Sequence, residues 1–138
     1  MQLKSVLELK EVDGMLAAAE EEAIHNGWAV SIAVVDDGGH LVAFRRLPGA
    51  SKSSAQIAID KARCSALTHR PTSFFAEMMA AGHAGAASLA GVIPMGGGLP
   101  VLFEGQVVGG IAVSGVKSEF DVQIAKAGLA FIVRDENH

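Results

Sequence analysis

Apolar positions recur every three or four residues near both ends of the chain, a spacing typical of helices with one buried face. In the first such segment these positions are Leu9, Val12, Leu16, Ala19 and Ala23. In the last they are Ile124, Ala125, Gly128, Leu129 and Ile132. The pattern predicts a first helix, with Ser5 and Glu8 at capping-box spacing before it and Gly27 after it, and a final helix that begins near Ser118.

Strict alternation replaces this pattern after the first helix and predicts an antiparallel hairpin. Its strands are Trp28–Val35 and Leu41–Arg46, joined by the glycine turn Asp36–Gly39. The first strand has large apolar residues on one face, namely Val30, Ile32 and Val34, and small ones on the other, namely Ala29, Ser31 and Ala33. The small face suits a closely packed helix.

The middle of the chain supplies that helix and further strands. Ser51–Thr68 is predicted as a second helix, and Pro71 starts a short third helix that runs to about Ala80. A stripe of small residues on the second helix can press onto the sheet: Ala55, Ala58, Ala62, Ser65 and Ala66. A connection rich in glycine and alanine, Gly82–Gly91, follows. Strands are then predicted at Val92–Met95, Leu99–Phe103 and Val107–Ser114.

This order of elements predicts an α+β fold, with an antiparallel sheet flanked by helices, because the turns are too short for helical crossovers. No linker, internal repeat or shift in composition divides the chain. We therefore expect residues 1–138 to form a single domain.

Composition excludes several classes of protein. The chain has 138 residues, of which 50% are hydrophobic and 19% charged, so it has enough apolar residues to form a core. Its formal charge is −4 and it has no basic cluster, which argues against a nucleic-acid partner. No apolar run approaches the ~20 residues that span a bilayer, so we expect no membrane partner.

Cysteine usage and the N-terminal sequence bear on location. Cys64 is the only cysteine, so it cannot form an internal disulfide, and no apolar signal-like stretch follows Met1. We therefore expect a cytoplasmic protein. The chain also has 16 glycines, no tyrosine and one tryptophan. Such small side chains permit close contact between subunits, and we expect a homo-oligomer, dimeric or larger.

Five motifs occur in a specific order. They are VVDDGGHLVAFRRLPGAS, IAIDKA, GGGLP, EGQVVGGIAVSG and DVQIAKAG. In this order they resemble the GlcG/HbpS-like family of small haem-associated proteins, whose members also occur as the C-terminal domain of PduO-type proteins. The resemblance covers the chain from the first helix to about Phe131. It implies a profilin-like arrangement of about five strands and makes haem or another tetrapyrrole the expected ligand.

Standard catalytic and zinc motifs are absent from the sequence, and polar residues around the two glycine-rich hairpins remain as candidates. The guanidinium groups of Arg45 and Arg46 suit a carboxylate such as a haem propionate. Lys61 lies among small residues and could anchor an anion or act as a base. The ordinary alternatives are a surface ion pair for the arginines and a solvated, paired lysine.

Three glycines and two histidines complete the candidate site. Gly96, Gly97 and Gly98 permit close approach of the backbone to a ligand, in a pocket where their loop meets the first hairpin. His83, in the glycine-rich connection, and His25, near the end of the first helix, are the candidates for a haem iron ligand. Exposed histidines without a ligand are the alternative, and His138 is set aside as terminal.

Three functions follow as hypotheses. The first is a haem- or tetrapyrrole-binding protein that handles haem. The second is an enzyme acting on a small organic or aromatic acid, with arginine and lysine binding the carboxylate and histidine as acid or base. The third is an accessory or assembly subunit without chemistry of its own. The sequence leaves open whether the protein is an enzyme.

Overall fold

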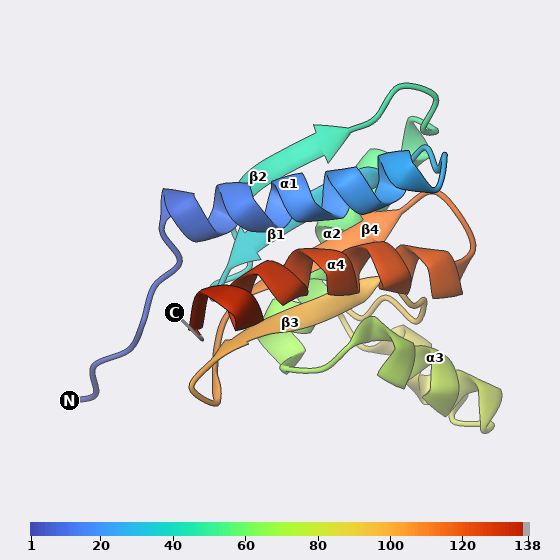
Figure 1. Cartoon of the computed structure of the whole chain (residues 1–138). Helices are drawn as coiled ribbons and strands as arrows, with labels where there is room; N and C mark the ends of the chain where they lie inside the picture. Colours follow the sequence, from blue (N-terminus) through green and yellow to red (C-terminus); the bar gives the residue numbers. More distant parts are fainter. Residues whose placement is uncertain (137–138) are drawn as a thin grey trace.

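An antiparallel sheet of four strands lies at the centre of the fold, in the order β2-β1-β4-β3 (Figure 1). The strands are β1 (Ser31–Asp36), β2 (Leu41–Arg46), β3 (Gly98–Phe103) and β4 (Gln106–Ser114). The computed structural model describes the backbone of residues 1–136 and the side chains of residues 1–133; His138 lies outside this range. The predicted α+β class and the antiparallel pairing are confirmed.

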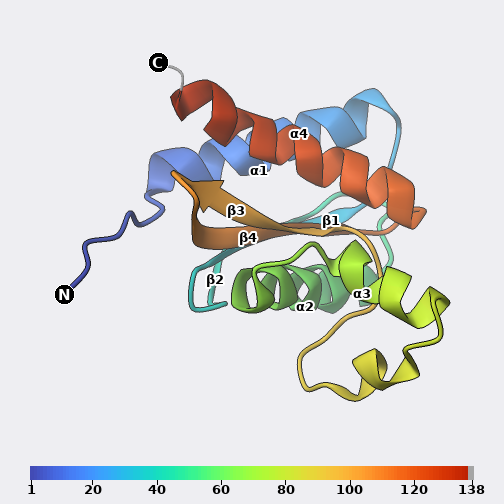
Figure 2. The same ribbon diagram turned by 90° about the horizontal axis from the view of Figure 1, so that it is seen from below.

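Helices cover both faces of the sheet, as Figure 2 shows. One face carries α1 (Leu9–His25) and α4 (Ser118–Glu136), and the other carries α2 (Ser53–Thr68). Beyond α2 the chain continues into α3 (Thr72–Ala80) and a short 3-10 helix, η1 (Ala84–Ser88). No helix within the described part of the chain is long and apolar enough to cross a membrane.

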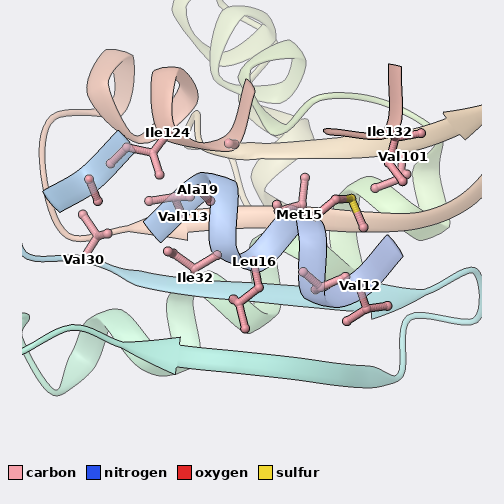
Figure 3. Close-up of a cluster of buried hydrophobic side chains, with 14 of the residues drawn as sticks. Val12, Met15, Leu16, Ala19, Val30, Ile32, Val101, Val113, Ile124 and Ile132 are labelled. Carbon is pink, nitrogen blue, oxygen red and sulfur yellow. The ribbon is translucent and has the colours of Figure 1, made fainter. Parts of the chain in front are cut away.

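The main core lies between the sheet and the pair α1 and α4 (Figure 3). Ile32 and Val34 of β1 point into it, beside Met15 of α1 and Ile124 of α4. The neighbouring β1 residue Ala33 faces α2 instead. There it joins a second, smaller core made of Ala33, Val35, Ala58, Ala62, Ala66 and Ala112. The predicted two faces of the first strand are confirmed.

Close packing of α2 on the sheet requires a glycine in β4. A Cβ atom built on Gly110 would lie 2.4 Å from the carbonyl oxygen of Ala62, a separation that real Cβ atoms do not show. The small side chains along α2 therefore lie against Gly110 of β4, which has no room for a larger side chain. Together they bring the helix backbone against the strand backbone.

Two details of the sequence-based prediction are wrong. Val92–Met95 is not a strand, because its backbone turns locally: the Met95 amide donates to the Ile93 carbonyl at 2.9 Å, and Pro94 has no amide hydrogen. The sheet therefore has four strands rather than about five. The first helix begins at Leu9 with Glu8 as its N-cap residue, so Ser5 does not cap it.

Candidate functional site

A buried ion pair joins α2 to the start of α4. The Lys61 ammonium lies 3.3 Å from a carboxylate oxygen of Asp121 and donates to the carbonyl of Val113 at 3.1 Å. The two side chains are 0% and 3% exposed. Lys61 is thus buried rather than solvated, and its ammonium is bonded to the Val113 carbonyl and the Asp121 carboxylate of its own chain.

Burial acts on both partners of this pair. It lowers the pKa of Lys61, against the attraction of Asp121, which favours the charged ammonium. It also raises the pKa of Asp121, against the opposing effects of Lys61 and of the Val116 amide, which donates to the carboxylate at 3.2 Å. Each charge would be unfavourable here without the other. The pair therefore needs both partners to be stable in the interior.

The glycine loop closes over this pair. Gly97 has a φ of +129°, and a Cβ built there would lie 2.8 Å from the Lys61 nitrogen and 2.5 Å from the Val113 carbonyl oxygen. The amide of Gly98 donates to the Thr72 hydroxyl at 2.9 Å. Nearby, the Ser65 hydroxyl is buried without a hydrogen-bond partner among the described residues. The structure brings Lys61, Gly97 and Gly98 together as an internal cluster.

The two arginines lie elsewhere. Arg45 and Arg46 are exposed on β2, which forms one edge of the sheet, whereas Gly98 begins β3 at the other edge. The Arg45 guanidinium pairs with the Glu20 carboxylate of α1, which is the surface ion pair considered as its alternative. Because β1 and β4 lie between the two edges, the expected meeting of the glycine loop with the arginine-bearing strand does not occur within one chain.

Both candidate iron ligands are exposed. His83 follows α3, where its amide donates to the carbonyl of Met78 at 2.9 Å. His25 is the last residue of α1. Neither histidine lies beside the ion pair. The structure brings no three metal-ligating side chains together within its described residues.

An open groove of about 390 Å³ lies between α3, the segment Pro94–Gly96 and the first turns of α4. Its apolar lining includes Ala76, Ala80, Pro94, Met95 and Val122. Glu77 and Glu119 lie in the same lining. Of the predicted site residues Gly96 lines this groove, and His83 comes three residues after Ala80, another lining residue.

Sequence reasoning missed Asp121 as a partner of Lys61. A signal for it was available, because Asp121 shares the helical spacing of Ile124, Ala125 and Gly128, and so lies on the buried stripe of α4. Lys61 likewise shares the stripe of Ala58, Ala62 and Ser65. Two opposite charges on two buried stripes suggest an internal ion pair.

The fold and the site describe a small α+β domain with a sealed ion pair and an open, largely apolar groove. A family model described as "Haem degrading protein HbpS-like" matches residues 7–130. Protein GlcG of Escherichia coli strain K12 is 39% identical over 114 residues, which cover 83% of this chain and 85% of that protein. The chain belongs to the HbpS-like family, as its motifs indicated.

Solved structures agree with this assignment. The Klebsiella pneumoniae protein ORFY has a TM-score of 0.90 at 31% identity, covering 96% of this chain and 94% of that chain. A double mutant of HbpS from Streptomyces reticuli has a TM-score of 0.86 at 33% identity, with coverage of 94% and 89%. A PduOC:haem complex has a TM-score of 0.84 with coverage of 92% and 95%, and its 24% identity shows a shared fold alone.

Proposed function

We propose that this protein binds haem or a related tetrapyrrole in the groove between α3, Pro94–Gly96 and α4. The observation that carries the proposal is the apolar lining of this groove beside an exposed methionine, Met95, which is 46% exposed. A porphyrin needs apolar side chains against its faces and a nitrogen or sulfur ligand for its iron. The family description and the haem complex of a structural relative support the choice of ligand.

His83 is the proposed iron ligand, with His25 as the alternative. His83 comes three residues after the end of α3, whose Ala76 and Ala80 line the groove. The segment around it, residues 81–91, contains no charged residue and is exposed except at Ala86. His25 belongs to α1, which does not line the groove.

We also propose that the protein forms a homo-oligomer, dimeric or larger, and acts in the cytoplasm. Leu89, 57% exposed within the uncharged segment 81–91, and Met79, 38% exposed, leave an apolar surface that a second subunit would cover. The cytoplasmic location rests on the single cysteine, Cys64, which is buried and free.

The competing hypothesis is an enzyme acting on an organic or aromatic acid, whose carboxylate an arginine (Arg45 or Arg46) and Lys61 would bind. In the structure Arg45 pairs with Glu20 and Lys61 is sealed, so these cations do not converge on one substrate. This arrangement favours the tetrapyrrole proposal. The accessory-subunit hypothesis makes a separate prediction, which is that hemin does not bind in a saturable way.

The test of the iron ligand is a hemin titration followed by the Soret band. We expect wild type to bind with a saturable spectrum of a histidine-ligated haem, and His83→Ala to lose that spectrum. His40→Ala is the matched control, because His40 is also exposed but precedes β2, which lies at the opposite edge of the sheet from β3. Loss in His25→Ala instead would reassign the ligand. Equal, non-saturating spectra in all variants would contradict the proposal and favour the accessory-subunit hypothesis.

A further inference from the structure

A second cavity lies at the other end of β3 from the groove. It has a volume of about 740 Å³, and its lining includes residues 5–8 of the N-terminal segment and Glu104 of the turn between β3 and β4. Gly96, in the groove, precedes β3, and Phe103, in the cavity, ends it. At ~3.3 Å per residue the two sites are roughly 20 Å apart.

One wall of this cavity is an extended segment that the protein holds in place. Lys4 pairs with Asp37 in the turn between β1 and β2. Three residues later, Leu7 packs on the main core, so close to Gly109 that a Cβ there would lie 2.7 Å from its methyl group. The segment is therefore held by one contact just before the stretch that lines the cavity and by a second within it.

The cavity combines an apolar floor with an acidic rim. Val108 and Ile132, each 4% exposed, belong to the main core and form its floor together with Leu7 and Phe103. The charged groups among its described lining residues are three carboxylates, those of Glu8, Glu11 and Glu104. Glu8 and Glu11 lie at the N-terminal end of α1, where the helix dipole favours negative charge.

We propose that this cavity binds small cationic amphiphiles, namely amines that carry an alkyl or aryl body. The apolar body would contact Val108, Ile132 and Phe103, while the ammonium group would lie between the carboxylates of the rim. The three carboxylates of the rim attract a cationic head group and repel an anionic one. The proposal therefore adds a second ligand class to the protein, independent of the groove.

The position of Glu104 offers a variant that removes charge without weakening the fold. Glu104 has a φ of +49° and Gly105 a φ of +79°, so the turn between β3 and β4 uses left-handed backbone at both positions. Asparagine is preferred over glutamate at such a position. Glu104→Asn should therefore favour the turn while it removes one carboxylate from the rim.

The experiment uses haem-free protein with isotope-labelled methyl groups, titrated with octylamine, octanol and octanoate under NMR. These probes share one chain length and differ in the charge of the head group. We expect saturable shifts at Val108 and Ile132 with octylamine, at least tenfold weaker binding of octanol, and none of octanoate. Binding of octylamine should weaken as salt is added.

Variants then test the rim. Glu104→Asn and Glu11→Gln should each weaken octylamine binding about threefold, the effect expected for one partly exposed carboxylate. Glu21→Gln is the control, because it removes the same charge from α1 about 15 Å further along the helix. Equal binding of octanol and octylamine, or unchanged affinity in both rim variants, would overturn the proposal. So would the absence of shifts at Val108 and Ile132. None of these results bears on hemin binding in the groove.

Discussion

Lys61 and Asp121, 60 residues apart in the chain, meet 3.3 Å apart in the interior and join α2 to α4 across one end of the sheet. The two helices cover opposite faces of the sheet, so this contact links the two cores. Gly97 lies directly over the pair and leaves no room for a side chain. We therefore interpret the lysine, the aspartate and the glycine loop as one structural unit that holds the wall of the groove.

Removal of one member of this pair should be strongly destabilising. Lys61→Met leaves the Asp121 carboxylate buried without its cation, and we expect the free energy of unfolding to fall by about 3–5 kcal/mol. The double variant Lys61→Met/Asp121→Asn removes both charges, keeps an oxygen that can accept from the Val116 amide, and should recover most of that loss. Urea unfolding of wild type and both variants measures this. A double variant no more stable than the single variant would contradict the account.

The loss in Lys61→Met should depend on pH. Burial already raises the pKa of Asp121, and the variant removes the cation that opposes this rise. A carboxyl group whose pKa is higher in the folded than in the unfolded state contributes stability at low pH and loses it as pH rises through the folded pKa. The destabilisation relative to wild type should therefore be smaller at pH 5 than at pH 8. A difference independent of pH would show that Asp121 does not carry the effect.

Close packing of α2 on β4 predicts a sharp contrast between two glycines. Gly110→Ala would place a methyl group 2.4 Å from the Ala62 carbonyl oxygen, so the helix must shift, and we expect a loss of about 2–3 kcal/mol. Gly85→Ala is the control, because a Cβ built on Gly85 would have nothing within 4 Å and the residue has no positive φ. Thermal unfolding should separate the two variants by at least several degrees. Equal melting temperatures would contradict the described packing.

Self-association is tested by the mass in solution. The uncharged, exposed segment 81–91 predicts light-scattering masses of at least twice 14.2 kDa at micromolar concentration. Leu89→Lys introduces a charge into this segment and should lower the mass. Leu67→Lys, at a comparably exposed leucine of α2, is its control. A monomeric wild type would contradict the proposed oligomer.

Local patterns predicted most of the fold. The alternation in Trp28–Val35 correctly assigned Ile32 to one core and Ala33 to the other, because successive residues of a strand point to opposite faces of the sheet. The prediction of a strand at Val92–Met95 was wrong. A strand needs a neighbouring strand to pair with, and the β-propensity of its residues does not provide one.

The candidate site was less predictable, because it depends on contacts between distant segments. Lys61, Gly97 and Gly98 were predicted to bind a ligand, and the structure places them together in the interior, where Lys61 pairs with Asp121 from another motif. The position of Arg45 and Arg46 followed from the strand order, which puts β2 and β3 at opposite edges. Short turns in the sequence predict that consecutive strands pair with each other. The pairing of β1 with β4, which are far apart in the sequence, instead depends on how the whole chain packs.

The central claim is that hemin binds in the groove between α3, Pro94–Gly96 and α4, and a groove-filling variant tests it most directly. Ala80 is exposed and lines the groove, so Ala80→Trp should occupy the space of the porphyrin. Ala17→Trp, at an exposed position of α1, is the matched control. In a Soret titration we predict saturable binding to wild type and Ala17→Trp, and at least tenfold weaker binding to Ala80→Trp. Equal saturation of all three proteins, or saturation of none, would contradict the account.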